Sequence, residues 1–342
     1  MMRGMAQASQ VRRAPIGPIP IDAILAARER ISGATVRTPI LDLEADGNVQ
    51  VFAKLENLEA IGSFKLRGAG NALALADPAA LQRGVYTASA GNMAQGVAWN
   101  ARRLGIPCTV IVPDHAPTTK LAAVERLGGR IVKVPVSRWW QVLVDHGHPD
   151  FDGLFIHPFA DPAVMAGNGT IGLEIVEDAP QLKAVVVPWG GGGLSVGIAS
   201  AIKAMRPAVR VFAAEVETAA PFAASLAAGR PVTIDYIPSW VDGIGGGSVL
   251  DEIWQLASSL LEGSITVSLD QIADAIRLLA SHGVVAEGAG AVSVAAALTG
   301  QAGATSIVAV VSGGNIDARV LGAILAGGSP SLTSPALGAR RI

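Results

Sequence analysis

The stretch AVVVPWGGGGLS, residues 184 to 195, decides the fold class of this chain. Its four apolar residues and Pro188 indicate a buried strand, Gly190 to Gly193 indicate a tight loop, and Ser195 lies near the start of a helix. Glycines let backbone N–H groups turn inward, and a helix N-terminus adds partial positive charge. This order predicts a phosphate-binding turn at the carboxyl end of a strand.

The same alternation of strands and helices continues on both sides of this stretch. Apolar runs rich in β-branched residues alternate with segments rich in Ala and Leu, such as Met93 to Leu104 and Asp270 to Ser281. This pattern is typical of βαβ units with mostly parallel sheets, so the sequence predicts an α/β fold. The expected strands are 51–56, 84–89, 108–113, 130–135, 184–189, 209–215 and 306–312.

Composition excludes several classes of protein. At 342 residues the chain is longer than one hydrophobic core usually organises, so we expect two lobes with a ligand cleft between them. The net charge of −2 provides no basic surface for nucleic acid. The uncharged stretch from Ala184 to Ile202 has the length of a membrane span, but Pro188 and four glycines interrupt it. Residues 1 to 18 lack the apolar segment of a secretion signal, so a cytoplasmic location is expected.

A nucleotide site is the main alternative for the glycine loop. The dinucleotide pattern G-x-G-x-x-G fits in no register, because Ser195 and Val196 stand where its last glycine belongs. Glu215 nevertheless ends an expected strand about twenty residues downstream, where an acid that binds ribose would lie. A nucleotide-binding module without enzymatic activity and a glycine loop without any ligand both stay open.

A second segment, GSFKLRG at residues 62 to 68, places Lys65 near the start of an expected helix. Desolvation and the helix dipole both destabilise an ammonium group there, which lowers the pKa of the lysine toward use as a nucleophile. Taken by themselves, Lys65 and Arg67 would more often be solvated side chains on a helix surface.

Two further loops follow expected strands. Asn92, at the end of TASAGN (87 to 92), either caps a helix or donates its amide N–H to a ligand oxygen. Ser312, in SGGN (312 to 315), offers a neutral hydroxyl or simply forms a turn. Parallel sheets place ligands at the carboxyl ends of their strands, so functional residues are expected just after the strands.

Together, these four segments resemble the fold-type II pyridoxal-phosphate (PLP) enzymes, above all the threonine and serine dehydratases and serine racemase. The resemblance covers residues 20 to 325 and keeps the family's order along the chain. It implies two interwoven lobes, each with a mostly parallel sheet flanked by helices, and PLP in the cleft between them. The implied large PLP-binding domain is 19–83 with 162–328 and the small domain is 84–161, with a flexible N-terminal tail at 1–18 and a C-terminal tail at 329–342.

The resemblance also implies a role for each site residue. Lys65 would carry the cofactor as a Schiff base and remove the α-proton of the substrate, and the segment Glu287 to Gly290 would line the cofactor. The cofactor ring, phenolic oxygen and pyridine nitrogen would be contacted by Phe64, Asn92 and Ser312, respectively. The phosphate would be held by Gly190, Gly191, Gly192, Gly193 and Leu194, and the substrate by Ser89, Ala90, Gly91 and Met93.

The implied activity is β-elimination of water from a 3-hydroxy amino acid, which yields a 2-oxo acid and ammonia. A neutral Ser312 cannot keep the pyridine nitrogen protonated as a carboxylate would, which favours prompt elimination. β-Replacement and serine racemisation are the alternatives among PLP enzymes. A homodimer is the family expectation, and no membrane or nucleic-acid partner is expected.

The carboxylate loop departs from the family pattern at two positions. Relatives usually read Ser-Ser-Gly-Asn-His, where this chain has Ser89-Ala90-Gly91-Asn92-Met93. Ala90 cannot donate a proton on the face opposite the lysine, so racemase activity is expected to be weak or absent. Met93 replaces a polar ring with an apolar chain, which hints at a bulkier substrate.

The tryptophans Trp139, Trp140 and Trp189 either pack the lobes or shape the substrate pocket. With Met93 and the segment EVETAAP (215 to 221), they give the chain a resemblance to the dehydratases of hydroxyectoine utilisation and to phenylserine dehydratase. The expected substrate therefore ranges from threonine and serine to phenylserine or an amino acid derived from hydroxyectoine.

No metal site is expected. Some relatives bind a divalent cation through a glutamate and a later aspartate, but here Glu215 is followed by Pro221 at the position of the aspartate. His146 and His148 lack further ligands at metal spacing and are interpreted as surface histidines. Cys108 lies in an apolar expected strand, which indicates a buried thiol.

Overall fold

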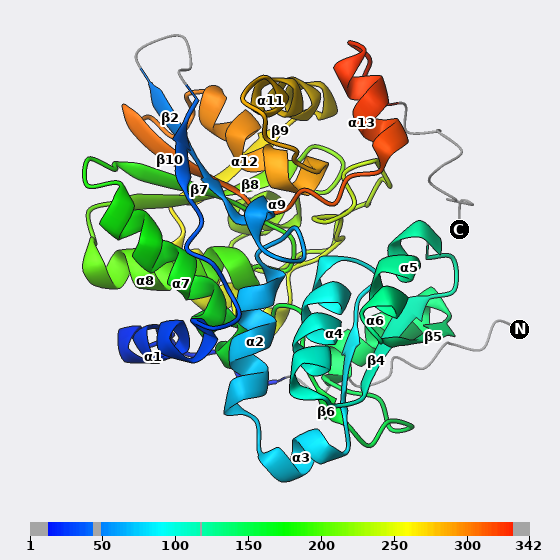
Figure 1. Cartoon of the computed structure of the whole chain (residues 1–342). Coiled ribbons are helices and arrows are strands. Elements are labelled where there is room, and N and C mark those ends of the chain that lie inside the picture. Colours follow the sequence, from blue (N-terminus) through cyan, green and yellow to red (C-terminus); the bar gives the residue numbers. More distant parts are fainter. Residues whose placement is uncertain (1–12, 44–48, 117, 331–342) are drawn as a thin grey trace, which may run out of the picture.

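A six-stranded sheet forms the larger of two lobes in the computed structural model, which describes residues 13–43, 49–116 and 118–330 (Figure 1). The strand order is β1-β2-β10-β7-β8-β9, and every neighbouring pair is parallel except β1 with β2. The strands are β1 (Ile40–Asp42), β2 (Gln50–Leu55), β7 (Ala184–Pro188), β8 (Arg210–Val216), β9 (Gly263–Val267) and β10 (Ser306–Val311).

A four-stranded parallel sheet in the order β5-β4-β3-β6 forms the small lobe. Its strands are β3 (Val85–Ala88), β4 (Cys108–Pro113), β5 (Arg130–Val134) and β6 (Leu154–Phe155). In Figure 1 this lobe lies at the lower right, in cyan to green-cyan.

Helices surround both sheets, as the βαβ pattern predicts. In chain order they are α1 (Ile21–Ile31), the 3-10 turn η1 (Glu56–Leu58), α2 (Lys65–Leu75), α3 (Pro78–Gln82), α4 (Asn92–Leu104), α5 (Thr118–Arg126), α6 (Val136–Asp145), α7 (Pro162–Asp178), α8 (Gly193–Met205), α9 (Pro221–Ala228), α10 (Asp251–Leu260), α11 (Leu269–Ser281), α12 (Gly288–Leu298) and α13 (Ala318–Leu325).

The two lobes are interwoven along the chain. The chain builds β1 and β2 of the large sheet, leaves to form β3 to β6 of the small lobe, and returns to the large sheet at β7. The predicted fold class is therefore confirmed, whereas the domain limits 19–83 with 162–328 and 84–161 stay a prediction. Of the two predicted tails, residues 1–12 and 331–342 lie outside the described residues, and within 13–18 the N–H of Ile16 donates to the Glu252 carbonyl at 2.8 Å.

The large sheet is covered on both faces, which explains why its central strands are apolar throughout. Along β10, Ile307, Ala309 and Val311 pack into one hydrophobic cluster, and the alternating residues Val308 and Val310 pack into another. Strand β7 alternates in the same way between the two clusters. A strand buried on both faces leaves only its end loops free for polar function, so the site lies at the strand ends.

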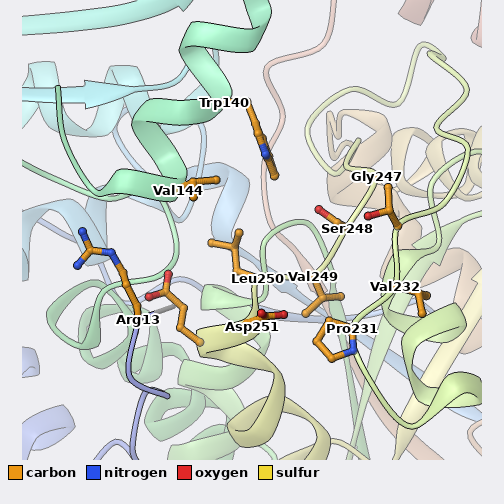
Figure 2. A pocket seen from close by; sticks show the side chains of 12 residues that line it. Arg13, Trp140, Val144, Pro231, Val232, Gly247, Ser248, Val249, Leu250 and Asp251 are labelled. Carbon is orange, nitrogen blue, oxygen red and sulfur yellow. The ribbon is translucent and has the colours of Figure 1, made fainter. Parts of the chain in front are cut away.

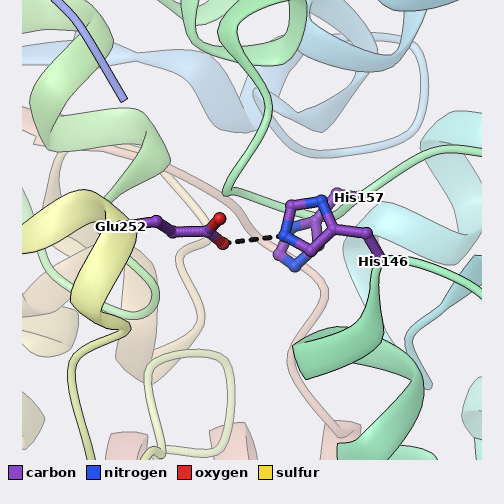
Figure 3. Close-up of side chains that lie close together, drawn as sticks. All are labelled: His146, His157 and Glu252. Carbon is purple, nitrogen blue, oxygen red and sulfur yellow. Dashed lines mark hydrogen bonds and ion pairs between the residues drawn. The ribbon is translucent and has the colours of Figure 1, made fainter. Parts of the chain in front are cut away.

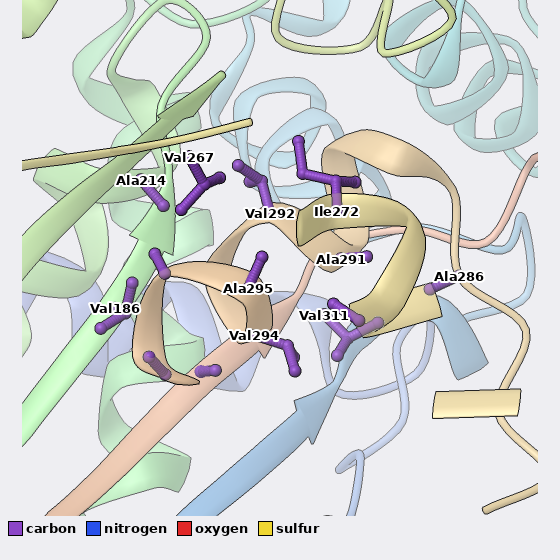
Figure 4. Packing of buried hydrophobic residues seen from close by; sticks show 14 of the residues in the cluster. Val186, Ala214, Val267, Ile272, Ala286, Ala291, Val292, Val294, Ala295 and Val311 are labelled. Carbon is purple, nitrogen blue, oxygen red and sulfur yellow. The ribbon is translucent and has the colours of Figure 1, made fainter. Parts of the chain in front are cut away.

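Helix α12 lies on one face of this sheet because its side chains are small (Figure 4). A Cβ atom on Gly290 would lie only 2.2 Å from the Gly313 carbonyl oxygen, so this helix can approach the loop after β10 closely only with glycine there. The close approach brings the start of α12, at Glu287, beside that loop. The packed side chains in this cluster include Val186, Ala214, Val267, Ile272, Ala291, Val292, Val294, Ala295 and Val311.

The long uncharged stretch from Ala184 to Ile202 divides into β7, the glycine loop and most of α8, as the sequence predicts. Within the described ranges, no helix has both the length and the apolar character needed to cross a membrane.

Candidate active site

The glycine loop joins β7 to α8 and presents a row of open backbone N–H groups. Gly192 has a φ of 88°, a left-handed conformation that favours glycine. Among the described residues, no acceptor takes a hydrogen bond from the backbone N–H groups of Gly190 to Ser195, and α8 has no side-chain cap. Buried N–H groups without acceptors are uncommon in folded proteins, and at a helix N-terminus they suit an anion. This donor set fits a phosphate group.

The glycines of this loop are also required by close packing. A Cβ atom on Gly191 would lie 2.3 Å from the ring of Phe159, and one on Gly193 would lie 2.4 Å from the Phe159 carbonyl oxygen. On the other side, a Cβ atom on Gly192 would lie 2.7 Å from the indole of Trp189. Trp189 is buried and stacks on Phe222, with ring centroids 4.0 Å apart, so this tryptophan supports the loop from the core.

Lys65 begins α2, and its Nζ donates to the Pro158 carbonyl oxygen at 2.7 Å. Burial of the ammonium group lowers the pKa of Lys65 to about 8. At pH 7, one unit below this pKa, roughly a tenth of the amine is unprotonated, and this is the form that Schiff-base chemistry requires. The ring of Phe64 lies beside this amine, with its centroid 5.0 Å from Nζ. The reading of Lys65 as an ordinary solvated side chain is wrong.

The start of α2 is fastened to the loop after β10. The N–H of Phe64 donates to the Ser312 carbonyl at 3.1 Å, and the N–H of Gly314 donates to the Gly62 carbonyl at 2.9 Å. The Ser312 hydroxyl donates to the Ala289 carbonyl at 3.3 Å. The structure thus brings Ser312 close to the segment that carries Phe64 and Lys65, although 247 positions separate Ser312 from Lys65 in the sequence.

Asn92 joins the same group of loops through Glu287. The Asn92 Nδ2 donates to Glu287 Oε1 at 2.6 Å, and Asn315 Nδ2 donates to Asn92 Oδ1 at 2.8 Å. A Cβ atom on Gly313 would lie 2.4 Å from Glu287 Oε1 and 3.1 Å from Asn92 Nδ2, so these groups converge there. Sequence reasoning placed Glu287 near the cofactor but missed its contact with Asn92.

The carboxylate loop lies between β3 and α4. The N–H of Ser89 donates to the Ile111 carbonyl at 3.1 Å, and the N–H of Gly91 donates to the Ser89 hydroxyl at 3.2 Å. Ser89, Ala90 and Gly91 are partly exposed, whereas Met93 is 1% exposed and packs in the core of the small lobe. The roles of these four residues in substrate binding stay predictions.

Arg67 is buried, which corrects its interpretation as a surface arginine. Its Nε donates to Glu56 Oε2 at 2.8 Å, and its Nη1 donates to Glu174 Oε1 at 2.6 Å. Lys54 pairs with the other oxygen of Glu174 at 2.5 Å. Glu59 lies 3.3 Å from the Arg67 Nε, and burial and then Glu56 raise the pKa of Glu59 to about 7. This arginine cluster (Arg67, Lys54, Glu56, Glu59 and Glu174) ties α2 to β2, η1 and α7.

Two other polar residues have structural roles that the sequence did not reveal. Glu215 is fully buried and accepts from the N–H groups of Phe222 and Ala223 at 2.8 and 2.7 Å and from the Ser264 hydroxyl at 2.6 Å. It therefore caps the first turn of α9. His148 is buried rather than on the surface, and it accepts a hydrogen bond from Arg138 at 3.1 Å. Cys108 is buried as expected, and burial raises the pKa of its thiol to about 12.

His146, His157 and Glu252 bring their ligand-type atoms within 4.8 Å of one another (Figure 3). His157 accepts from the N–H of Ala160 at Nδ1 (2.7 Å), and its Nε2 lies 3.2 Å from the Leu143 carbonyl oxygen. The first contact requires an unprotonated Nδ1 and the second a protonated Nε2, so both nitrogens of a neutral ring are used. The arrangement suits a hydrogen-bonded cluster rather than a metal centre.

Trp140 lines a cleft of about 450 Å³ where α6 faces the start of α10 (Figure 2). The cleft is lined also by Arg13, Val144, 231–233 and 247–252, and it contains neither Lys65 nor the glycine loop. Trp139 lies beside Trp140, with ring centroids 6.4 Å apart, and packs against the small-lobe cluster that contains Tyr86. A role for either tryptophan in the substrate pocket stays a prediction.

Comparison with known proteins identifies the family. The family model described as pyridoxal-phosphate dependent enzyme matches residues 31–313. L-threonine ammonia-lyase of Thermotoga maritima is 41% identical over 284 residues, which cover 81% of this chain and 70% of the relative. The catabolic L-threonine dehydratase of Escherichia coli is 35% identical over 316 residues, which cover 88% of this chain and 94% of that protein.

Solved structures give the same result. Maize serine racemase superposes with a TM-score of 0.83 at 32% identity, covering 89% of this chain and 96% of that one. The processed form of threonine deaminase isoform 2 from Solanum lycopersicum superposes with a TM-score of 0.79 at 31% identity, covering 96% of this chain and 100% of that one. The chain therefore belongs to the pyridoxal-phosphate dependent enzymes, as a PLP-dependent lyase of fold type II that is similar to the threonine and serine dehydratases.

Proposed function

We propose that this enzyme removes water and then ammonia from a small 3-hydroxy amino acid and releases a 2-oxo acid. One observation carries the proposal. A lysine with a pKa of about 8 lies in the same group of loops as a row of backbone N–H groups without protein acceptors. Relatives named L-threonine ammonia-lyase and L-threonine dehydratase support this reaction over the alternatives.

The residues present fit PLP, and each would hold a different part of it. The N–H groups of Gly190 to Leu194 would bind the phosphate, which suits their position at the start of α8. Asn92 would face the phenolic oxygen, Ser312 the pyridine nitrogen, and Phe64 the ring. When bound, PLP supplies the electron sink for the bond broken at the substrate α-carbon.

The remaining chemistry belongs to side chains of the chain itself. Lys65 would bind the cofactor and afterwards remove the α-proton, because its lowered pKa leaves part of the amine unprotonated. Ser89 and Gly91, together with neighbouring backbone N–H groups, would hold the substrate carboxylate. Ser312 has a neutral hydroxyl, so it does not keep a neighbouring nitrogen protonated as a carboxylate would. Ala90 has no proton to donate, which disfavours racemisation.

For the substrate side chain, we propose an apolar group larger than the methyl of threonine, as in phenylserine or an amino acid derived from hydroxyectoine. Met93 supports this, because it puts an apolar side chain in the first turn of α4, directly after the carboxylate loop. Each Å² of apolar substrate surface removed from water would contribute roughly 25 cal/mol. The burial of Met93 in the core means that its effect on the substrate would act through the position of α4.

Product analysis tests the reaction, and three substrates test its specificity. With serine, threonine and phenylserine, the enzyme should release 2-oxo acid and ammonia in equal amounts, with kcat/KM rising in that order. Met93→His should shift preference back toward threonine. Inverted amino acid without 2-oxo acid would indicate a racemase, and a product substituted at Cβ by an added thiol would indicate β-replacement. A wild-type preference for serine would remove the proposed bulky substrate.

The proposal includes a homodimer, on the basis of the family resemblance alone, and a cytoplasmic location, which stays a prediction from the sequence. Light scattering during gel filtration measures the mass, and a particle of one chain would contradict the dimer.

A further inference from the structure

His146, His157 and Glu252 link the two lobes, and we call these three residues the interlobe cluster (Figure 3). His146 follows α6 of the small lobe in a left-handed conformation, with a φ of 53°. Its Nε2 lies 2.7 Å from Oε1 of Glu252, which is in the first turn of α10 in the large lobe. The rings of His146 and His157 are in contact and tilted, with centroids 4.3 Å apart and 33° between their planes.

The His157 ring fixes the shape of the turn that follows it. Its Nδ1 accepts from the N–H of Ala160 at 2.7 Å and from the N–H of Phe159 at 3.2 Å. Its Nε2 faces the Leu143 carbonyl at 3.2 Å. Burial and then the neighbouring His146 hold the pKa of His157 well below its ordinary value. A neutral ring with one tautomer therefore braces the segment from His157 to Ala160.

This turn contacts both functional parts of the site. The Pro158 carbonyl accepts from Lys65 Nζ at 2.7 Å. The next residue, Phe159, packs so closely on the glycine loop that a Cβ atom on Gly191 or Gly193 would overlap with it. A displacement of this turn would therefore move the lysine amine and the glycine loop together.

Helix α10 supports the glycine loop from the other side. Ile253, next to Glu252, lies 3.1 Å from the position of a Cβ atom on Gly192. The N–H of Ile16 donates to the Glu252 carbonyl at 2.8 Å, which fixes the start of the helix. The charged and titratable groups around the interlobe cluster also include Arg13, which donates to the Asp145 carbonyl beside His146, and Lys65.

We propose that His146 and Glu252 are positioning residues, which act through the His157 ring to hold the Pro158–Phe159 turn against Lys65 and the glycine loop. The proposal rests on the proposed role of Lys65 as the residue that binds PLP. Neither positioning residue touches the substrate. The geometry points to this role because one continuous set of contacts runs from Glu252 to the lysine amine. This set of contacts does not include the carboxylate loop at Ser89 to Gly91.

The experiment compares wild-type holoenzyme with His146→Ala, Glu252→Ala, the double variant and the rescue variant His146→Gln, which keeps an N–H donor. His282→Ala is the matched control, because His282 also follows a helix, α11, but lies outside the interlobe cluster. Three quantities are measured: the rate at which PLP leaves the holoenzyme, kcat, and KM for threonine. The proposal depends on the binding of PLP by Lys65. If wild-type holoenzyme shows no visible absorption band, or if Lys65→Ala keeps the band, both the role of Lys65 and this proposal are wrong.

If the band is present, His146→Ala and Glu252→Ala should each speed PLP release and lower kcat about tenfold, as loss of one hydrogen bond to a charged group predicts. KM should change by less than about twofold, because the carboxylate loop is untouched. The double variant should lose no more than either single variant, and His146→Gln should restore most of the loss. Unchanged PLP release and kcat in His146→Ala, or additive losses in the double variant, would overturn the proposal. If His146→Ala does not fold, Glu252→Gln, which keeps the side-chain volume, must show the same pattern in weaker form.

Discussion

Two polar regions of the molecule, the arginine cluster beside α2 and the glycine loop at the start of α8, differ in the partners that the protein gives them. In the arginine cluster, Arg67 and Lys54 face three carboxylates, with the closest nitrogen-to-oxygen distances between 2.5 and 3.3 Å. In the glycine loop, the N–H groups from Gly190 to Ser195 find no acceptor in the described part of the chain. Since buried polar groups normally have partners, we interpret the first region as scaffold and the second as a site prepared for a ligand.

This comparison predicts opposite effects of mutation. Changes in the arginine cluster should reduce the free energy of unfolding, whereas changes in the glycine loop and at Lys65 should reduce cofactor binding and turnover.

Lys65→Ala should abolish both the visible absorption band of bound PLP and the release of 2-oxo acid. One amine would serve as covalent attachment point and as base, and general-base catalysis alone contributes on the order of 10² to 10⁴ in rate. Spectra and product assays on the purified variant check this. Turnover near the wild-type rate would show that another residue carries the chemistry.

Arg67→Ala should destabilise the fold by about 3 to 5 kcal/mol, because it leaves buried carboxylates without their cation. Urea unfolding measures the loss. The matched control is Arg28→Ala, which removes a surface pair with Glu177 and should cost less than about 1 kcal/mol. Equal losses in the two variants would contradict the view that the arginine cluster is scaffold.

Glu59 should make stability depend on pH. The pKa of Glu59 is raised from the ordinary 4.5 to about 7 in the folded state. The contribution of Glu59 to the free energy of unfolding is therefore complete below pH 4.5 and is lost as the pH rises through 7. Wild-type stability should therefore fall by about 3 kcal/mol relative to that of Glu59→Gln between about pH 5 and pH 8. Parallel unfolding curves across this range would contradict the raised pKa.

Gly191→Ala should weaken PLP binding about tenfold and should reduce the free energy of unfolding by less than Arg67→Ala does. The new Cβ would lie 2.3 Å from the Phe159 ring, so the glycine loop must shift. The shift would misplace the backbone N–H groups that bind the phosphate, which would cost roughly the energy of one charge-assisted hydrogen bond. Gly246→Ala is the control, since a Cβ there meets nothing within 4 Å. If the variant lost stability but bound PLP normally, the glycine loop would be part of the scaffold and not a binding site.

Ala90→Ser should introduce slow racemisation of serine beside elimination, because it restores a proton donor on the second face of the substrate. Chiral chromatography of unreacted serine measures it. Rapid racemisation by the wild-type enzyme would show that Ala90 does not limit this activity.

The fold could be predicted from the sequence where a strand forms a run rich in β-branched and other apolar residues. All seven expected strands, which are β2, β3, β4, β5, β7, β8 and β10, begin within one residue of the expected positions. The strands β1, β6 and β9 were missed, because β1 and β6 have only three and two residues and β9 begins with glycine. Such short segments carry no periodic signal, and only their partners in the sheet define them.

The candidate site also has some residues that the sequence could predict and others that it could not. The glycine loop, Lys65, Asn92 and Ser312 have local signals, because each follows a strand or starts a helix. The arginine cluster and the interlobe cluster have none, since Arg67 and Glu174 are 107 residues apart and His146 and Glu252 are 106 apart. A single arginine or histidine does not reveal a partner at that distance, so sequence alone left Arg67 and His148 on the surface.

The central claim is that Lys65 and the glycine loop bind one cofactor. Reduction of the holoenzyme with borohydride fixes PLP to the lysine that carries it, and mass spectrometry of the digested protein identifies that residue. We expect one modified lysine, Lys65, and we expect excess inorganic phosphate to slow rebinding of PLP to the glycine loop. Modification at another lysine, such as Lys54 or Lys183, or no modified lysine at all, would contradict it.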